Sequence, residues 1–403
     1  MKQKQKNIKV SGLIEKIAER GHAMIAEARN TALAPSLEKS IRKFTISQAS
    51  EILDISRHEI RNLETRKTIP EASKERRTPN GRLERTYTLA DINKIRDTLK
   101  IRKRKPENME PAKIAVINFK GGSSKTVTAT HQAQALAIKG YRVLLIDCDN
   151  QGSASVLNGL NPDLDTDRSD TIHDILLGNP EADIKKIIRK THWDTLDLIP
   201  GNLSLYNAEL TLPVQMQQAS AIPGKDVTQI FTRLKNAIDK IQNEYDFIVF
   251  DCPPSVGAIT SSVLSASNSI LCPVVPNIVD FSSTIQFLEM TNSVIKHVNA
   301  DIKNMMILCS KFNGRVTAKE VHEMMKVTFG NVCMASHMIE SEAIARAQTE
   351  YCTLFEVTDI PGDKKAHNRA LDALWKVNDE LESKYELTWK SLVVNKEELA
   401  HNA

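Results

Sequence analysis

An apolar run, a short glycine-containing turn and a helical stretch follow one another at positions 114–139, and they constrain the fold more than any other feature. The run from Ile114 to Ile117 predicts a buried strand, and residues 127–139 predict a helix. The turn between them contains Lys-Gly-Gly-Ser-Ser-Lys-Thr at positions 120–126. A strand that enters a helix through such a turn directs backbone N–H groups and the helix dipole toward an anion.

The end of this turn has the residue types that bind nucleotide phosphates. Lys125 is expected to reach the β- and γ-phosphates, and the Thr126 hydroxyl is expected to bind Mg²⁺. The match to the general phosphate-loop pattern is imperfect, because Phe119 and Ser124 stand where that pattern has glycine. An ordinary glycine-containing turn between a strand and a helix is the alternative.

From residue 112 onward, strand-like and helix-like stretches alternate. This order predicts an α/β fold with a mostly parallel, doubly wound sheet, in which ligands bind at the carboxyl ends of the strands. The predicted strands are 114–117, 143–146, 196–199, 247–250, 270–275 and 305–309.

Acidic residues directly follow two of these apolar runs. Asp147 and Asp149 come after the strand at 143–146, and Asp251 comes after the strand at 247–250. Carboxylates at strand ends beside a phosphate loop suit Mg²⁺, which takes oxygen ligands and keeps several waters. Asp251 is expected to hold the Mg²⁺ shell, and one of the other two could orient the attacking water. The alternative is that these aspartates cap loops or helices.

Charge is distributed unevenly along the chain. Residues 1–110 contain 26 Lys and Arg against 15 Asp and Glu, a net +11, whereas the remainder contains 28 against 35, a net −7. A basic N-terminal segment before an acidic remainder suggests contact with a polyanion, and a solvated basic surface without a ligand is the alternative. The six scattered cysteines predict buried free thiols in a reducing compartment.

Residues 44–98 have the pattern of a DNA-binding unit. Two short helical stretches, 45–53 and 57–64, flank a tight turn, which is typical of a helix-turn-helix. A basic hairpin around Asn80-Gly81 then predicts a wing. Any helical hairpin can mimic the first pattern. The side chains expected to reach DNA are Arg57, His58, Arg61, Asn62, Arg77 and Arg82.

The expected organisation has three parts. Residues 1–40 contain an N-terminal helix expected to bridge two copies of the chain, with packing on the rest of the chain as the alternative. Residues 41–105 form the winged helix-turn-helix, and residues 106–403 form the α/β domain. No apolar run approaches the roughly 20 residues needed to cross a bilayer, and the polar N-terminus lacks the apolar centre of a secretory signal. A cytoplasmic protein without a membrane partner is therefore expected.

The three motifs together resemble those of the deviant-Walker ATPases of the ParA/MinD group. They are Lys-Gly-Gly-x-x-Lys-Thr at 120–126, Leu-Ile-Asp-Cys-Asp-Asn-Gln-Gly at 145–152 and Asp-Cys-Pro-Pro at 251–254. The helix-turn-helix and wing in front resemble those of the large plasmid-partition ParA proteins that also repress their own operon. The resemblance covers nearly the whole chain.

The resemblance implies a role for each matching residue. Lys120 is the signature lysine that reaches phosphates across or near a face-to-face dimer interface, and Asp149 positions the attacking water. The expected catalytic residues are Lys120, Lys125 and Asp149, and the expected Mg²⁺ residues are Thr126, Asp147 and Asp251. The expected nucleotide contacts are Lys120, Gly121, Gly122, Ser123, Ser124, Lys125, Thr126, Val127, Pro276, Asn277 and Asn313.

The resemblance also implies a process. The expected function is slow ATP hydrolysis in DNA partition, with ATP or ADP and Mg²⁺ as cofactors. The expected partners are a second copy of the chain, operator DNA, non-specific DNA on the nucleoid and a ParB-like centromere-binding protein. The alternatives are a repressor with ATP as an allosteric ligand, and a metabolic ATPase of the same superfamily. A surface for non-specific DNA is expected at Arg315, Lys319, Lys326, Lys364, Lys365 and Arg369, with solvated helix faces as the alternative.

Overall fold

The computed structural model describes residues 12–21, 23–24, 39, 41–69, 71–73, 81, 83–224, 226–357 and 364–401. The chain divides into two compact units, Met1–Lys39 and Ser40–Ala403. In the first unit, residues 12–21 are helical, and the apolar side chains of Leu13 and Ile17 are exposed. The predicted N-terminal helix is therefore seen over these residues, and its predicted bridging role stays a prediction.

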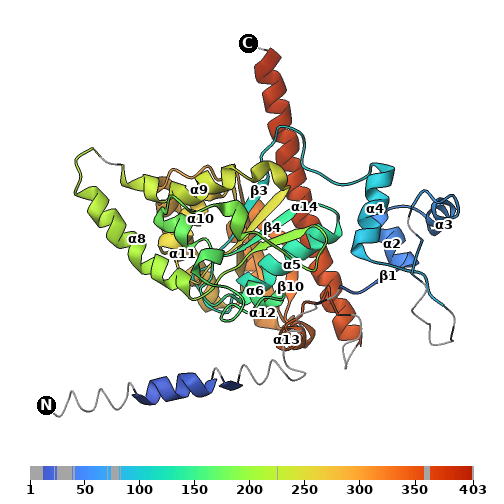
Figure 1. Ribbon diagram of the computed structural model, residues 1–403, viewed down its shortest axis with the longest axis horizontal. Helices are drawn as coiled ribbons and strands as arrows, with labels where there is room; N and C mark the ends of the chain where they lie inside the picture. The colour runs from blue at the N-terminus through green and yellow to red at the C-terminus, as the bar shows by residue number, and fades with distance from the viewer. Residues whose placement is uncertain are drawn as a thin grey trace. The chain divides into compact units, whose positions relative to one another are not determined.

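The second unit contains a large mixed sheet with helices on both faces (Figure 1). Its strands are β3 (Ala112–Val116), β4 (Val143–Asp147), β5 (Arg189–Lys190), β6 (Leu196–Ile199), β7 (Phe247–Asp251), β8 (Ser269–Val274), β9 (Asn304–Phe312) and β10 (Cys333–Ile339). The strand order is β10-β9-β8-β3-β7-β4-β6-β5, and every neighbouring pair is parallel except β5 with β6.

Helices connect these strands, and two more, α13 and α14, follow the last strand. They are α5 (Lys125–Ile138), α6 (Ser153–Leu157), α7 (His173–Leu177), α8 (Ser204–Ser220), α9 (Thr232–Asp239), α10 (Ala258–Ala266), α11 (Ile278–His297), α12 (Val316–Phe329), α13 (Glu342–Thr349) and α14 (Lys364–His401). Short 3-10 helices lie at Arg168–Asp170, Ile184–Ile187, Val227–Ile230, Gln242–Glu244 and Gly330–Val332.

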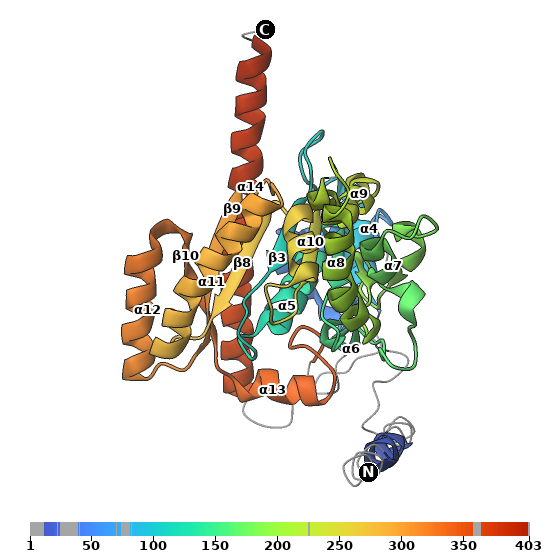
Figure 2. The same cartoon turned by 90° about the vertical axis from the view of Figure 1, so that its left-hand side faces the viewer.

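Alternate residues of the central strands supply two separate cores, one on each face of the sheet. Ile114 and Val116 of β3 pack into the core that contains α5 and α14, and Ala115 packs into the core that contains α8, α9 and α10. Strands buried on both faces explain the nearly unbroken apolar runs in the sequence. Figure 2 shows the long helix α14 running behind β9 and β10.

A smaller part precedes this sheet within the second unit. It contains β1 (Phe44–Thr45), α2 (Ile46–Leu53), α3 (Arg57–Thr65), β2 (Thr86–Tyr87) and α4 (Leu89–Leu99), with β1 antiparallel to β2. Thr45 with Gln48 and Thr88 with Asp91 form capping boxes, as the spacing of Thr88 and Asp91 predicts. The predicted wing hairpin at 76–85 lies mostly outside the described residues.

The predicted fold class and each of the six predicted strands are confirmed. The sequence did not predict β5 or β10, which occupy the two edges of the sheet. In the described part of the chain, no helix combines the length and hydropathy that a membrane span requires.

Candidate phosphate-loop site

The carboxyl ends of β4 and β7 bring two buried carboxylates together. Asp147 and Asp251 are the last residues of these strands and are register partners. Neither side chain is accessible to solvent. Asp147 Oδ2 accepts hydrogen bonds from the backbone N–H and the hydroxyl of Ser155, both at 2.8 Å. Ser155 thus fixes the orientation of one carboxylate of the pair.

Burial makes both carboxylates poor anions in the absence of a cation. Burial raises the pKa of Asp147 to about 7, and the charge of Asp149 adds to this effect. Burial also raises the pKa of Asp251 well above its ordinary value, and the Asp147 charge raises it further, whereas the Thr126 hydroxyl lowers it. A bound cation would stabilise the charged forms of both groups.

A divalent cation fits this arrangement. Neither carboxylate oxygen of Asp251 makes a hydrogen bond of normal geometry with the described residues, although both oxygens are buried. Buried carboxylate oxygens without such a bond are costly, and a bound Mg²⁺ would supply a partner. Within the described ranges, no group of three His, Cys, Asp or Glu side chains is placed to hold a metal. Mg²⁺ does not need one, because it keeps several waters and takes one or two carboxylates.

The predicted phosphate loop connects β3 to α5 beside these carboxylates. Gly121 and Gly122 are exposed, and Gly122 has a φ of 76°. Ser124 also has a left-handed φ, 73°, at the N-cap position of α5, and its side chain makes no capping hydrogen bond. Ser124 therefore occupies a conformation that favours glycine, which explains why the general pattern has glycine there.

Lys125 begins α5 and is buried against the loop. Its exposed fraction is 7%, and burial lowers the pKa of its ammonium group. Lys125 Nζ donates a hydrogen bond to the backbone carbonyl of Lys120 at 3.2 Å. Thr126, the next residue, faces Asp251. The lysine and the hydroxyl thus lie where a phosphate chain and its cation would meet.

Lys120 has a different partner from the one expected. Its ammonium group forms an ion pair with Asp280, in the first turn of α11. The predicted contact between Lys120 and nucleotide phosphates stays a prediction.

Asp149 lies in the turn after β4. Its N–H donates to Asp147 Oδ1 at 3.2 Å, and its own Oδ1 accepts from the N–H of Gln151. A Cβ at Gly201 would lie 2.7 Å from the Asp147 carbonyl oxygen and 2.8 Å from that of Asp149, so this glycine permits the loop after β6 to approach. Asp149 therefore caps the turn after β4, as the alternative interpretation of these aspartates predicts. Its side chain is half-exposed beside the carboxylate pair.

Comparisons with known proteins identify the family. Residues 112–304 match a family model described as an AAA domain. The chain is 32% identical to a putative replication protein A of Rhizobium rhizogenes, covering 94% of this chain and 96% of the relative. It is 31% identical to protein SopA of Escherichia coli strain K12, covering 83% and 87%. This chain belongs to the ParA/MinD-type family of plasmid partition ATPases.

A solved structure agrees at the level of the fold. A partition protein has a TM-score of 0.65 and 21% identity, covering 92% of this chain and 98% of that one. Family membership makes this chain an ATPase, and ATP or ADP with Mg²⁺ stay its expected cofactors.

Three residues expected to contact the nucleotide lie at the ends of later strands of this ATPase. Pro276 and Asn277 follow β8, and Asn313 follows β9. Asn277 caps α11, since its Oδ1 accepts from the Asp280 N–H at 2.9 Å and its Nδ2 donates to Asp280 Oδ2 at 2.6 Å. Asn313 Oδ1 accepts from the Arg315 N–H. Both amides have structural partners, and their predicted base contacts stay predictions.

The predicted DNA-reading residues on α3 share one exposed face. Arg57, His58, Arg61 and Asn62 are all exposed, whereas Ile60 is buried. Arg77 and Arg82 lie outside the described residues. Sequence reasoning missed Glu64, a buried carboxylate that accepts from the Ala72 N–H and the Tyr87 hydroxyl and pairs with Arg85. Glu64 thereby ties α3 to the segments on either side of the predicted hairpin.

Sequence reasoning also missed a residue that supports the loop after Asp251. Glu209 of α8 accepts hydrogen bonds from the N–H groups of Ala258 and Ile259, both at 2.9 Å, and so caps α10. A Cβ at Gly257 would collide with the Glu209 carboxylate. The glycine is therefore required for this cap, and the cap fixes the end of the segment that begins at Asp251.

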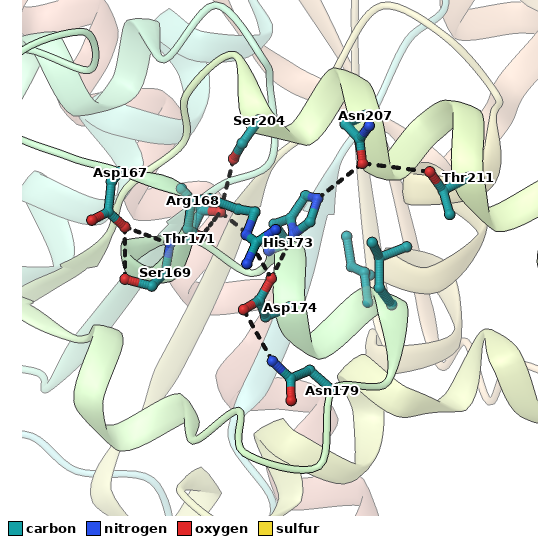
Figure 3. A network of polar contacts seen from close by, with 12 residues as sticks. Asp167, Arg168, Ser169, Thr171, His173, Asp174, Asn179, Ser204, Asn207 and Thr211 are labelled. Atoms are coloured by element: carbon teal, nitrogen blue, oxygen red, sulfur yellow. Dashed lines mark hydrogen bonds and ion pairs between the residues drawn. The ribbon is translucent and has the colours of Figure 1, made fainter.

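A polar network holds α8 in place (Figure 3). His173 of α7 contacts Asp174 Oδ1 through Nδ1 at 2.7 Å and Asn207 Oδ1 of α8 through Nε2 at 3.2 Å. Asn207 lies two residues before Glu209. The network therefore sets the position of α8, and with it the cap of α10.

Proposed function

We propose that this ATPase hydrolyses ATP slowly and uses the cycle of binding and hydrolysis to partition DNA. The observation that carries the proposal is the register pair of buried carboxylates, Asp147 and Asp251, beside Lys125 and Thr126. Buried carboxylates with raised pKa values and unpartnered oxygens are costly, and such groups gather at sites that bind cations.

Each residue has a separate task in this proposal. Thr126 and Asp251 would hold the cation, and Asp147, oriented by Ser155, would support its water shell. Lys125 binds the terminal phosphates, and Asp149 orients the attacking water. Mg²⁺ would supply neutralisation of the phosphate charge. Phosphoryl transfer needs this positioning more than covalent catalysis.

The variant Asp149→Asn separates binding from turnover. We expect it to retain binding of a fluorescent ATP analogue and to lose at least about 100-fold in phosphate release, as expected when one group that acts in the transition state is removed. The matched control is Asp163→Asn, an exposed aspartate on the same surface loop region. Equal phosphate release from D149N and the unmodified chain would contradict the role assigned to Asp149.

A second candidate function is a transcriptional repressor in which ATP is only an allosteric ligand. The strained Ser124, at a φ of 73°, favours it, because strain at the phosphate loop reduces its fit to the phosphates. A turnover assay distinguishes the candidates. Binding of ATP without Mg²⁺-dependent phosphate release, with or without DNA, would support the repressor.

Two modes of DNA binding belong to the proposal. The exposed face of α3 would bind the operator of the protein's own operon, and an ATP-bound homodimer would bind non-specific DNA on the nucleoid. The exposed basic residues that suit non-specific DNA binding are Arg315, Lys319, Lys364, Lys365 and Arg369. Lys326, on the same helix as Lys319, is half-buried. A ParB-like centromere-binding protein would stimulate hydrolysis and release the DNA. Differential affinity of the two states for nucleotide would select the mode.

The proposed division of labour follows residues 1–40, 41–105 and 106–403. Contacts inside the second unit hold the last two parts together: Arg96 of α4 donates to the carbonyl of Ile138 in α5 at 2.7 Å, and Asn93 donates to Asp194 at 2.7 Å. The operator mode is tested with Arg61→Ala, against Lys94→Ala as an exposed control on α4. Only R61A should weaken operator binding, by about 1–3 kcal/mol. Unchanged binding would contradict operator recognition by α3.

A further inference from the structure

The first half of the phosphate loop is attached to β8 and α11 by three consecutive residues. Asn118 Nδ2 donates a hydrogen bond to the Pro273 carbonyl of β8 at 2.8 Å. The ring of Phe119 packs on that of Phe287 in α11, with centroids 5.7 Å apart. Lys120 then forms its ion pair with Asp280 of α11. Two neighbouring elements, β8 and α11, thus hold the three residues that precede the glycines.

The attachment at Phe119 accounts for a departure from the general phosphate-loop pattern. A glycine at 119 would leave no ring to pack on Phe287, which is itself 1% exposed. Phe119 therefore anchors the loop on α11 through an apolar contact. The glycine of the general phosphate-loop pattern could not make this contact. This anchor keeps Lys120 within reach of the first turn of α11.

Asp280 is well placed to hold the ammonium group of Lys120. Its exposed fraction is 7%, it lies in the first turn of α11, and Asn277 fixes its carboxylate through a hydrogen bond of 2.6 Å to Oδ2. Asp280 Oδ1, the other oxygen, faces the ammonium group of Lys120. The carboxylate is thus nearly buried and oriented, whereas the side chain of its partner Lys120 is 40% exposed.

The same loop is closed at its other lysine. Lys125 Nζ donates one hydrogen bond to the backbone carbonyl of Lys120. The side chain of Lys120 is at the same time paired with Asp280. Both lysines expected to bind phosphates therefore have protein partners. Phosphate oxygens would compete with the carboxylate for Lys120 and would join or replace the carbonyl at Lys125.

We propose that Asp280 is a positioning residue that holds Lys120 away from the phosphates in the nucleotide-free chain. Nucleotide binding then exchanges one anionic partner of Lys120 for another, so the loop opens only when phosphates are present. This inference rests on the proposed function, because it concerns regulation of the same site.

If Asp280 competes with phosphates for Lys120, removing its carboxylate should strengthen the binding of MgATP. The variant Asp280→Asn keeps an oxygen and a similar shape for the Asn277 contact but gives up the negative charge. Lys120 is then released without cost, and the chain should bind MgATP about 3- to 10-fold more tightly, the change expected for loss of one competing ion pair.

A double-mutant cycle with Lys120→Gln tests the inference in the full-length chain. The readout is the dissociation constant for MgATP, measured by titration of a fluorescent ATP analogue against the unmodified chain, D280N, K120Q and D280N/K120Q. D280N should tighten binding only when Lys120 is present. Glu289→Gln, which removes an exposed carboxylate from the same helix, should leave the affinity unchanged.

A purely structural role of Asp280 predicts a different pattern. Loss of the α11 cap would lower the melting temperature and change the affinity equally in both backgrounds, and that result would overturn the inference. The inference would also be overturned if D280N bound MgATP with unchanged or weaker affinity while thermal unfolding showed that the variant is folded. If the unmodified chain itself bound no MgATP, the proposed function would fail first, and that outcome is distinct from either of the others.

Discussion

Asp147 and Asp251 are register partners at the carboxyl ends of the parallel strands β4 and β7. Neither carboxylate is exposed, and burial raises the pKa of each. Two anions that burial disfavours, placed next to Lys125 and Thr126, form a site that is stable in the charged form only with a cation. The neighbouring elements explain how the chain holds this arrangement, and each makes a testable prediction.

The cap of α10 by Glu209 predicts non-additive effects at Gly257. Gly257→Ala should displace the Glu209 carboxylate and lower the free energy of unfolding by about 1–2 kcal/mol, the value of a lost helix cap. Glu209→Ala should cost a similar amount. In chemical denaturation, the double variant should cost little more than either single one, whereas full additivity would show that the two residues act independently.

The side chain of Arg96 predicts a large loss of stability on substitution. Arg96 is 3% exposed and donates to the carbonyls of Ile52 and Ile138, so it joins α2 to the end of α5. Arg96→Met leaves both carbonyls unpaired and should cost about 2–4 kcal/mol. Lys94→Met, on the exposed side of α4, is the control for urea unfolding. Equal midpoints for R96M and K94M would refute this role.

Buried His131 predicts acid sensitivity. Its Nδ1 contacts the Val127 carbonyl at 2.8 Å and its Nε2 accepts from the Leu354 N–H, which describes a neutral ring. Burial lowers the pKa of His131 from 6.5 to about 4. The unfolded chain therefore takes up the proton first, so stability is complete above pH 6.5 and falls as the pH drops toward 4.

The size of this loss is up to about 3 kcal/mol at pH 4, since each unit of pKa corresponds to about 1.4 kcal/mol. His131→Gln should remove that part of the pH dependence of the melting temperature between pH 6.5 and 4. His58→Gln, at an exposed position on α3, should keep it. An identical pH profile for H131Q and the unmodified chain would be the contrary result.

The backbone at Ser124 predicts a stabilising substitution. Ser124→Gly relieves a φ of 73° and should raise the free energy of unfolding by up to about 1 kcal/mol without loss of phosphate release. Gly122→Ser introduces a side chain at a φ of 76° and should have the opposite effect. A less stable S124G chain, measured by thermal unfolding, would show that the serine makes a contact worth more than the strain.

Local sequence was sufficient to predict the six inner strands of the sheet and the polar residues that follow them. Buried parallel strands are apolar throughout, so β3, β4 and β7 stand out, and the polar residues that follow them define the binding edge. The edge strand β10 contains Ala335, Ser336 and His337, and β5 has only two residues, so neither has a continuous apolar pattern.

The supporting residues of the site could not be predicted in the same way. Glu209 and Asp280 act on segments far from them in the chain, the N-terminus of α10 and the phosphate loop. The Asn277-x-x-Asp280 spacing predicts a helix cap, but nothing near either carboxylate in the sequence indicates its distant partner. Only the fold brings each of them to its partner, and for Ser124 only the backbone conformation reveals the strain.

Mg²⁺-dependent phosphate release from ATP, measured side by side for the purified full-length chain and Asp251→Asn, tests the central claim most directly. The unmodified chain should release phosphate slowly, and faster with DNA. D251N should release phosphate at least about 100-fold more slowly. Its melting temperature should stay unchanged or rise, because a buried carboxyl group is removed. Equal release from both chains, or neither binding nor release by the unmodified chain with or without DNA, would contradict the assignment of this site.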